Sequence, residues 1–493
     1  MLLAVSTAMV APTAVTEQRD GQTIEVTFAG RFPFGIYRWA YLPFDVPEGV
    51  RQIRVAVSHE HFAVGGVARN VLDLGVFGPA GHDLGNAAGF RGWSGGARDG
   101  FVISGAYATP GYLAGPIDPG VWAVALGPVV LSPWGMAWRV HVTLERGTPT
   151  AGVDPQAEPP AAPAPRPVTL AGASIRGARW YRGDLHVHTV HSDGERDPGE
   201  LVADARAAGL DFVVSTEHNT NAANRVWPMC GTGPLLVIPG EEVTTRHGHW
   251  LAIGLPERAW VDWRYGPRDR AFPRFAAEVR AAGGLVVAAH PAVPLPGSAW
   301  EFGFADVEAL EVWNGRWNVD DEVSLRLWQR LLRQGRRVVA VGGSDSHGKH
   351  QRVGSPQTAV HAHELTVPAI VDGLRRGRSY IVRSGDVACE LTAACPSGGA
   401  SHMAGPGQTL RVPPGTAVSV TAVISGAAGA SAALITAAGR VGRATVRSAR
   451  DRVQWELDPT LCSMARFARL EVRAPRQGIP GAMVALTNPV WLA

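Results

Sequence analysis

The chain has 493 residues, of which 46% are hydrophobic and 18% charged, and its formal net charge is +3. This length is too great for one compact core, so we expect two to four domains. The nearly balanced charge gives no support to nucleic acid or a membrane surface as a partner. Four cysteines without CxxC spacing predict ordinary thiols, with a Cys389–Cys395 bridge as the open alternative.

Residues 1–150 predict an all-β sandwich, because short β-type runs alternate with clusters of Gly, Pro and Asn. The start, Met1 to Val15, is apolar but has no basic stretch and is too short to span a bilayer. We interpret it as the beginning of the folded domain, with a weak export signal as the alternative, and expect a cytoplasmic protein. The β-type runs are Ile24–Phe28, Val50–Ser58, Val71–Phe77 and Val121–Leu126.

Residues 151–170 predict a linker. Its central stretch, DPQAEPPAAPAPRP from Asp154 to Pro167, is dominated by Pro and Ala, which form a stiff, extended chain that cannot bury a core.

Residues 171–385 alternate between short apolar runs and helical segments, which predicts parallel strands covered on both faces, in a barrel or a doubly wound sheet. One helix is strongly indicated: Asp197 can cap it, Pro198 occupies its first turn, Glu200 completes a capping box and Gly209 ends it. The strand-like runs are Phe212–Thr216, Leu235–Ile238, Leu285–Ala289, Val307–Val312 and Val338–Val341.

Residues 386–493 predict a second, smaller β-sandwich. From about Gly385 the helical pattern stops, and β-type runs follow at Ala417–Ile424, Ala432–Thr436 and Arg469–Arg473.

Histidines concentrate in the central region, nine of the sixteen lying between residues 186 and 350. His186 and His188 alternate as in a strand, so both imidazoles project from one side and can chelate one ion. His218 and His290 directly follow predicted strands. In a parallel barrel such strand ends converge on one mouth, which is how the fold gathers ligands for a metal cluster.

The motifs GDLHVHTVHSDG, DFVVSTEHN, VIPGEEVTT…GHWLAIG, AAHP and GGSDSHG resemble, in order and spacing, those of the PHP (polymerase and histidinol phosphatase) superfamily over about residues 180–350. This resemblance implies an α/β fold, a distorted (βα)7 TIM-like barrel, here flanked by N- and C-terminal β-sandwich domains. TEHN, GHWLAIG, EVWNG and RLEVR…ALTNPVWL resemble the carbaryl-hydrolase-like branch. Where many relatives have TDH, this chain has Glu217, whose role stays open.

The resemblance also implies a ligand set for two or three divalent ions. A first ion would be held by His186, His188, Glu242 and Asp345; a second by Glu242, as a bridge, with His249 and His290; a third by Asp193, His218 and His347. Mixed imidazole and carboxylate ligation suits Zn²⁺, Mn²⁺ or Fe²⁺. Adjacent dications acidify a shared water, so a metal-bridging hydroxide would be the nucleophile.

Neighbouring residues carry open alternatives. The family pattern favours Glu242 over Glu241, which would face the other way. His247 is either a supporting hydrogen-bond donor or a surface histidine. His191 either contacts substrate, with a possible role as proton donor, or is structural, and Asn314 either lines the pocket or shapes a turn.

Lys349, the single lysine of the chain, and Arg352 lie just beyond the Asp345–His347 motif. There a cation could neutralise an anionic substrate or developing charge, and the alternative is a solvated loop.

Hydrolysis of a small phosphomonoester or phosphodiester is the leading function, and hydrolysis of a carbamate, carboxylic ester or amide is the alternative. Arg, Lys or Asn donors in the pocket would favour phosphate, whereas an apolar slot of Trp227, Trp250 and Trp313 would favour an aryl ester. The expected partner is a small-molecule ester, with neither nucleic acid nor membrane and with a homo-oligomer left open.

Two alternatives come from other classes. The common binuclear amidohydrolases need a carboxylated mid-barrel lysine, and the one lysine here lies after the last motif. A non-catalytic carbohydrate- or surface-binding protein with a relic barrel should have lost ligands, and none is missing.

Overall fold

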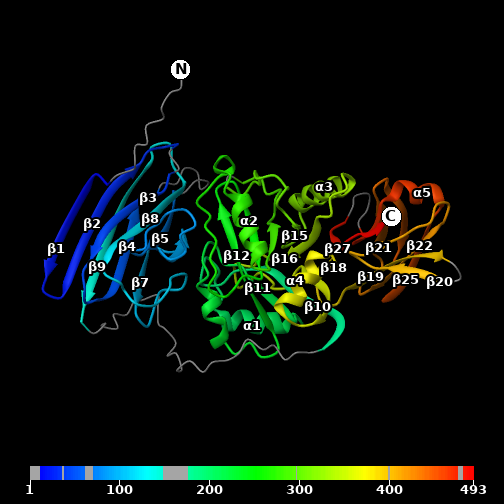
Figure 1. Ribbon diagram of the computed structural model, residues 1–493, viewed down its shortest axis with the longest axis horizontal. Helices are drawn as coiled ribbons and strands as arrows, with labels where there is room; N and C mark the ends of the chain where they lie inside the picture. The colour runs from blue at the N-terminus through cyan, green and yellow to red at the C-terminus, as the bar shows by residue number, and fades with distance from the viewer. Residues whose placement is uncertain are drawn as a thin grey trace, which may run out of the picture.

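The computed structural model describes residues 12–35, 38–61, 70–147, 176–295, 297–397, 400–475 and 481–493. The molecule is elongated, with a β-sandwich at each end and a mixed strand–helix region between them (Figure 1). The predicted linker at 151–170 and most of the apolar start lie outside the described residues. Among the described residues, no helix has the length and apolar character needed to cross a membrane.

The N-terminal region consists of two antiparallel sheets that enclose one core, as the alternating β-type runs predict. The first has the order β1-β2-β9-β4-β7 and the second the order β3-β8-β5-β6. The strands are β1 (Ala14–Asp20), β2 (Thr23–Phe32), β3 (Ala40–Val46), β4 (Val50–His59), β5 (Val71–Phe77), β6 (Phe90–Gly95), β7 (Gly100–Ser104), β8 (Gly120–Val130) and β9 (Met136–Arg146).

The central region is built on eight neighbouring strands of a long curled sheet, in the order β16-β15-β14-β13-β12-β11-β10-β17. The β10/β11, β11/β12, β14/β15 and β15/β16 pairs are parallel, whereas β12/β13, β13/β14 and β10/β17 are antiparallel. The strands are β10 (Arg176–Val187), β11 (Phe212–Ser215), β12 (Leu236–Thr245), β13 (Gly248–Ile253), β14 (Leu285–Ala288), β15 (Ala309–Asn314), β16 (Val339–Gly343) and β17 (Gln357–Glu364).

Helices follow only some of these strands, so the mixed α/β class is observed but a regular (βα)7 alternation is not. Between β11 and β12 the described chain forms two single 3₁₀ turns, η1 (Ala223–Arg225) and η2 (Trp227–Met229), and β12 turns directly back into β13. The other elements are α1 (Pro198–Ala207), η3 (Pro267–Asp269), α2 (Phe272–Ala281), α3 (Val319–Arg333) and α4 (Val367–Arg375). The capping box predicted at Asp197 and Glu200 is present at the start of α1.

The short central strands are buried on both faces, as their apolar runs predict. On β11 and β12, Val213 and Val237 pack outward against α1, whereas Val214 and Ile238 point to the opposite face. The sheet curls until β16 returns to β10, where Val187 and Ser346 form an isolated parallel bridge. The result is a partly closed barrel whose strand ends face one mouth.

Glycine is required where β16 passes β10. A Cβ atom at Gly343 would lie 2.5 Å from the Cβ atom of His186, closer than two carbons can approach. The glycine of the GGSDSHG motif therefore lets the strand that ends at Asp345 press against the strand that carries His186.

The C-terminal region continues the central sheet. Strand β18 (Ser379–Val382) pairs with β17 on one side and with β27 (Met483–Thr487) on the other, and the sheet runs on through β26 and β23 to β24. A second sheet, β20-β19-β22-β25, closes a core with it. The remaining strands are β19 (Ala388–Ser397), β20 (Ala400–Ala404), β21 (Thr409–Leu410), β22 (Val418–Ser425), β23 (Ser431–Thr436), β24 (Gly439–Thr445), β25 (Arg450–Leu457), β26 (Phe467–Arg473) and β28 (Val490–Leu492).

The expectation that helices stop near Gly385 is wrong in one place, since α5 (Pro459–Ala465) lies between β25 and β26. Asp458 accepts a hydrogen bond from the backbone N–H of Leu461, and Pro459 occupies the first turn, so the start signal was present in the sequence. All four cysteines are free thiols, so Cys389 and Cys395 form no bridge.

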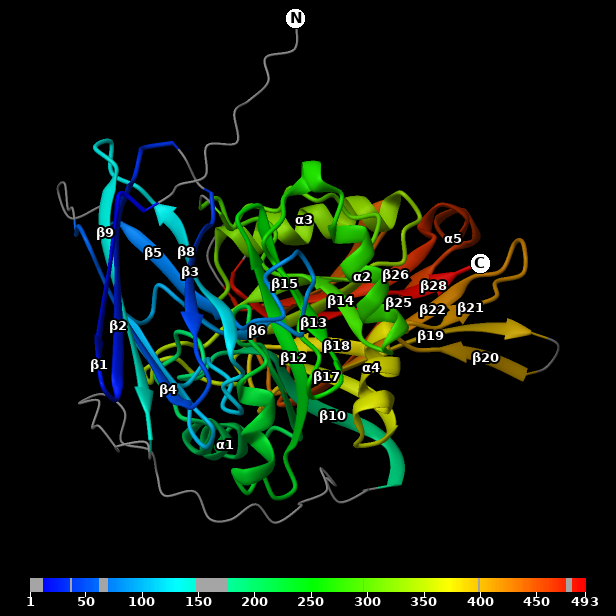
Figure 2. The ribbon, with the colours of Figure 1, turned by 60° about the vertical axis from the view of Figure 1, so that its left-hand side comes forward.

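The N-terminal sandwich packs on the central region through aromatic rings. The ring of Phe90 stacks on Trp260 with centroids 4.2 Å apart, and Trp93 packs against Trp263 at 4.4 Å. Polar contacts complete the interface: the carboxylate of Asp262 accepts from the backbone N–H of Gly85. The view in Figure 2 shows β6 and its neighbours lying against the central strands.

Candidate metal centre

The predicted ligands converge at the mouth formed by the ends of β10, β11, β14 and β16. Their ligand atoms fall into three groups, in each of which all atoms lie within 4.8 Å of one another. The groups are His186, His188, Glu242 and Asp345; Glu242, His249 and His290; and His188, Asp193, His218 and His347. The structure thus brings together all nine residues that the sequence nominated, and it adds His188 to the third group.

The first group is the deepest. Nε2 of His186 lies 3.2 Å from Oε2 of Glu242 and 3.3 Å from Oδ1 of Asp345. Nε2 of His188 lies 3.4 Å and 3.0 Å from the same two oxygens. Both imidazoles and Glu242 are completely buried. Two imidazole nitrogens and two carboxylate oxygens therefore face one small volume, the donor set that a tetrahedral dication takes.

Glu242 joins the first group to the second. Its Oε2 atom faces His186, whereas its Oε1 atom lies 3.0 Å from Nδ1 of His249 and 3.1 Å from Nε2 of His290. One carboxylate with an oxygen facing each group could bridge two ions, and this role of Glu242 stays a prediction.

The third group is more open. Oδ1 of Asp193 lies 3.5 Å from Nε2 of His218 and 3.3 Å from Nε2 of His347, and the Asp193 side chain is 44% exposed. His188 approaches this group only through Nδ1, 4.0 Å away. Since its Nε2 atom faces the first group, we assign His188 to that group.

The chemistry of the buried donors fits a cation. Among the described residues, the buried atoms without a hydrogen-bond partner include Nε2 of His186, Nε2 of His188, Oε2 of Glu242 and Oδ1 of Asp345. These four atoms lie close to one another, but none of them makes a hydrogen bond, because the angles between the groups are unsuitable. Buried polar atoms rarely stay unpaired, because desolvation costs about 1–3 kcal/mol for each. A shared ion would satisfy all four.

Charge in the cluster also favours a cation. Burial opposes ionisation of Glu242 and Asp345, but neighbouring histidines, His218 and His186 for Glu242 and His186 and His188 for Asp345, hold the pKa of both carboxyls well below the usual range. Burial likewise opposes the charged form of His218, yet Glu242 and Asp193 raise the pKa of this imidazole to about 10. In the metal-free chain, protons on histidine supply the positive charge that the carboxylates demand.

Glu311 supports the first group and was not nominated from the sequence. Its Oε1 atom lies 3.0 Å from Nδ1 of His186, and its Oε2 atom accepts from the backbone N–H of His290 and from Nδ2 of Asn314. A carboxylate on the far nitrogen fixes the tautomer and orientation of a ligating histidine. The sequence held a signal for this residue, because Glu311 is the one charged residue of β15.

Glu217, whose role the sequence left open, anchors the loop after β10. Its carboxylate accepts hydrogen bonds from the backbone N–H of Thr189 and from the hydroxyls of Thr189 and Ser192. Glu217 belongs to none of the three groups. It holds the loop that carries Asp193, one residue beyond Ser192.

Glu241 and His247 lie outside the groups. Glu241 is buried, and its carboxylate accepts from the backbone N–H of Val261, on the other face of β12 from Glu242. His247 lies partly exposed at the surface, where its Nδ1 atom is 2.9 Å from Glu301. The alternation along β12 explains the choice between the two glutamates.

Two nominated ligands have strained backbones. His290 and Asp345 both have positive φ, at 25° and 48°, a region that non-glycine residues rarely adopt. Such strain persists only where the surrounding structure imposes it, and it concentrates at functional sites. Here the backbone N–H of Asp345 donates to the carbonyl of His186, which holds the strained turn in place.

The three residues nominated for catalysis occupy different environments. His191 is buried, and its Nδ1 atom lies 3.2 Å from the hydroxyl of Thr189; burial and then the Arg98 charge lower its pKa to about 4. These surroundings favour the structural alternative for His191, and its contact with substrate stays a prediction. Lys349 is exposed and its ammonium is 2.5 Å from the Glu200 carboxylate, while Arg352 is exposed on the same loop. For these two cations the geometry favours the solvated-loop alternative, and a catalytic role stays a prediction.

The three tryptophans considered for an apolar slot are core residues. Trp227, Trp250 and Trp313 are at most 2% exposed. Each indole N–H is satisfied internally, by Ser215, Tyr265 and Gly315 respectively. Asn314, in contrast, reaches the first group, since its Nδ2 atom donates to Asp345 as well as to Glu311.

The N-terminal sandwich touches the loops that carry the ligands. Arg98 donates from Nη2 to the carbonyl of Val190, and the hydroxyl of Thr220 donates to the carbonyl of Gly111. These loop residues flank Asp193 and His218 in the sequence. The sandwich therefore covers one side of the mouth.

Comparisons with known proteins give only distant similarities. No family model matches the chain, and no curated protein matches it. Among solved structures, the chain is similar to a two-domain protein from Bacteroides vulgatus that contains a predicted PHP-like metal-dependent phosphoesterase. The identity is 18% and the TM-score 0.37, with 65% of this chain and 100% of that chain covered.

Two further solved structures are similar over about a third of the chain. One is a provisionally assigned metal-dependent phosphoesterase from Bifidobacterium adolescentis, with 23% identity, a TM-score of 0.26 and coverage of 35% of this chain and 90% of that chain. The other is an amidohydrolase from Chromobacterium violaceum, described with bound sulfate and no metal, with 18% identity, a TM-score of 0.26 and coverage of 38% and 92%.

Proposed function

We propose that this chain is a metal-dependent hydrolase of the PHP superfamily that acts on small phosphomonoesters or phosphodiesters. One observation carries the hydrolase assignment: nine imidazole and carboxylate side chains from distant segments form three groups, the first and second of which share Glu242. The unpaired buried atoms of the first group support the presence of an ion there. The finer fold assignment, a distorted (βα)7 barrel, belongs to the same proposal.

Bound dications in these groups would acidify water and polarise the scissile oxygen. The chain's own residues do the rest. Glu311 orients His186, and Asn314 holds the Asp345 carboxylate through one hydrogen bond. Glu217 holds the loop that carries Asp193 by accepting a hydrogen bond from Ser192. His191, two residues before Asp193, is the candidate for contact with substrate.

The pocket surroundings favour a phosphoester. An aryl ester or carbamate needs an apolar slot, and the three tryptophans that could have formed one are buried in the cores. On the side of the mouth covered by the N-terminal sandwich lies the guanidinium of Arg98, bonded to the Val190 carbonyl. A guanidinium near the site suits an anionic substrate. Carbamate, carboxylic-ester or amide hydrolysis is therefore the second candidate.

The test is an activity panel on protein stripped of metal and then loaded with Mn²⁺, Zn²⁺ or Fe²⁺ in turn. The substrates are p-nitrophenyl phosphate, bis-p-nitrophenyl phosphate, 1-naphthyl acetate and a 1-naphthyl N-methylcarbamate. We expect metal-dependent turnover of at least one phosphoester. Turnover of the naphthyl substrates alone would mean that the substrates are carboxylic esters or carbamates and not phosphoesters. Absence of bound metal would overturn the hydrolase proposal.

A matched pair of histidine variants locates the activity. His188→Gln removes a ligand of the first group and should lower kcat/KM by at least about 100-fold, as expected for loss of a metal ligand or its support. His247→Gln changes a histidine that pairs with Glu301 at the surface and should leave kcat/KM within about twofold. Equal effects of both substitutions would contradict the assignment.

A further inference from the structure

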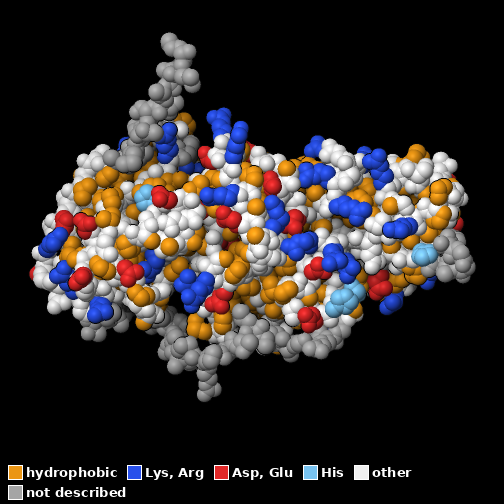
Figure 3. Space-filling view, in the orientation of Figure 1, with side chains coloured by type: hydrophobic (Ala, Val, Ile, Leu, Met, Phe, Trp, Pro, Cys, Tyr) orange, Lys and Arg blue, Asp and Glu red, His pale blue; other side chains and the backbone are white. Residues whose placement is uncertain are grey.

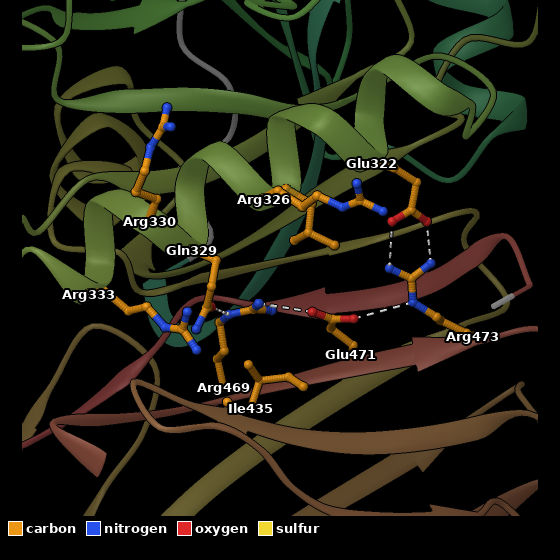
Figure 4. Close-up of a pocket in the computed structure, with 11 residues that line it drawn as sticks. Glu322, Arg326, Gln329, Arg330, Arg333, Ile435, Arg469, Glu471 and Arg473 are labelled. Carbon is orange, nitrogen blue, oxygen red and sulfur yellow. Dashed lines mark hydrogen bonds and ion pairs between the residues drawn. The ribbon is translucent and has the colours of Figure 1, made fainter. Parts of the chain in front are cut away.

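A second hollow, remote from the metal centre, lies between helix α3 and the C-terminal sandwich. It encloses about 470 Å³ and is lined by α3 on one side and by β23, β24 and β26 on the other. Basic side chains gather on the face of the molecule around α3 and the adjoining strands (Figure 3). The close-up in Figure 4 shows arginines from both walls around this hollow, which we call the arginine pocket.

Helix periodicity explains the wall contributed by α3. Residues four apart lie one above the other on a helix, so Glu322, Arg326 and Arg330 form one row, and Leu325, Gln329 and Arg333 form the next. Both rows line the arginine pocket. The opposite face of α3 packs into the central core through Trp328 and Leu332.

Five arginines face two glutamates in the arginine pocket, and only two arginines are paired. Arg473 binds both oxygens of Glu322 and also contacts Glu471, while Arg469 pairs with Glu471 at 2.9 Å. The described residues place no carboxylate within ion-pair distance of the other three, so their positive charge is uncompensated inside the structure. These are Arg326, Arg330 and Arg333, all exposed.

Arg469 is a buried cation that lines the arginine pocket. The residue is 1% exposed, its Nε atom donates to Gln329, and its guanidinium lies 4.8 Å from the centroid of the Trp328 ring. Its Nη1 atom, although buried, has no hydrogen-bond partner. An unpaired charged donor in a dry environment is costly, and it is the second feature, beside the surplus charge, that points to an anionic ligand.

We propose that the arginine pocket binds a small phosphate-bearing molecule, with the anion held between Arg469 and the guanidiniums of α3 that have no carboxylate partner. A phosphate group presents three acceptor oxygens and nearly two negative charges, which match several guanidiniums better than one carboxylate does. The volume is in the range of small-molecule sites. Leu325 and Ile435 supply apolar surface for the organic part. This site is independent of the metal chemistry.

The test measures binding of inorganic pyrophosphate to the full chain by isothermal titration calorimetry, with all metal removed by a chelator that is then dialysed away. The metal-free centre keeps protonated histidines, which can also attract an anion, so the arginine variants are needed to assign the binding to the arginine pocket. We expect saturable binding that weakens as salt is added. The double variant Arg326→Gln/Arg333→Gln should weaken it at least tenfold, since it removes two of the three uncompensated charges without touching the buried Arg469.

The matched control is Arg139→Gln, which removes an exposed arginine of β9 in the N-terminal sandwich and should leave the affinity within twofold. A metal-centre variant, Asp345→Asn, should also leave it unchanged. Equal affinity in the wild type and the double variant, or no saturable binding, would overturn the proposal. Citrate binding as tightly as pyrophosphate would also overturn it, because the site would then select charge rather than phosphate.

Discussion

The two β-sandwiches are joined to the central region in different ways. The N-terminal sandwich meets it through side chains: stacked rings such as Phe90 on Trp260, and single hydrogen bonds such as Thr220 to Gly111. The C-terminal sandwich is joined through the backbone, because β18 and β27 pair in one continuous sheet. A side-chain interface can separate as a unit, whereas a shared sheet cannot be divided without breaking main-chain hydrogen bonds.

The two sandwiches also differ in which part of the central region they contact. The N-terminal sandwich reaches the loops beside Asp193 and His218, and it covers the metal centre on one side. The C-terminal sandwich contacts α3 and the edge of the sheet and forms the arginine pocket. We infer that the first sandwich shapes access to the metal centre, whereas the second completes the fold of the barrel. Four predictions test this contrast.

The largest effect is expected at the aromatic interface. Trp263→Ala removes a ring that is 2% exposed and packs against Trp93 and Trp39, which should cost about 4 kcal/mol. The substitution should weaken the packing of the N-terminal sandwich on the central region. Calorimetry should then show two unfolding transitions. A single transition with an unchanged midpoint would show that the sandwich is not a separable unit.

On the C-terminal side, the side chain of Asn488 makes the two backbone hydrogen bonds to β16 that a neighbouring strand would make. Its side chain accepts from the backbone N–H of Ala340 and donates to the carbonyl of the same residue, both at 2.8 Å. Asn488→Ala leaves both buried groups unpaired and should cost about 3 kcal/mol. Barrel and C-terminal sandwich should still unfold together, at lower denaturant concentration. The control Asn86→Ala, in a loop of the N-terminal sandwich, should cost under about 1 kcal/mol; a second transition in Asn488→Ala would contradict the shared-sheet interpretation.

Metal affinity should depend on pH, and neither flank should alter this dependence. The pKa of His218 is raised to about 10, and Asp345, Glu311 and Glu242 raise that of His186 well above its ordinary value despite burial. Both imidazoles are protonated near pH 7 without metal, and a ligand must be neutral. Binding therefore expels protons, and affinity should rise about tenfold per pH unit for each proton released between pH 6 and 8. Calorimetry in buffers of different ionisation enthalpy counts these protons; an affinity that is flat or falls with pH would contradict the ligand assignment.

The smallest effect is expected from Thr220→Val, which removes one hydrogen bond from the N-terminal interface. The substitution keeps the shape of the side chain but leaves the carbonyl of Gly111 without this donor, at a cost of about 1 kcal/mol. Hydrogen exchange should accelerate in the N-terminal loops that face the barrel, with little change in β18 and β27. Faster exchange across the whole protein would mean that the two regions are more tightly coupled than we infer.

Local patterns predicted much of the fold. Val71–Phe77 is a strand with the expected bounds, and α1 begins with the expected capping box. The metal-centre side chains could be predicted because histidines and acids follow several predicted strands, and the resemblance to the PHP superfamily implied the ligand set. Their residue types, period and position were all visible in the sequence.

Long-range pairing was not predicted, because no local pattern specifies it. The β18/β27 pair joins segments about 100 residues apart, and either strand could end a separate sheet. The missing helix between β11 and β12 was equally hidden, because the residues there form 3₁₀ turns around Trp227 and its bond to Ser215. Glu311 was overlooked because its importance comes from His186 on β10 and from His290, which follows β14.

The shared sheet also has a consequence for synthesis. Strand β18 ends at Val382, but its outer partner begins at Met483. At roughly 5–20 residues per second, a ribosome needs on the order of 5–20 s to make the intervening chain. During that time the nascent barrel presents an open edge of unpaired backbone groups, the kind of surface that recruits other chains into aggregates. We therefore expect a chaperone to be needed mainly while the second sandwich is being translated.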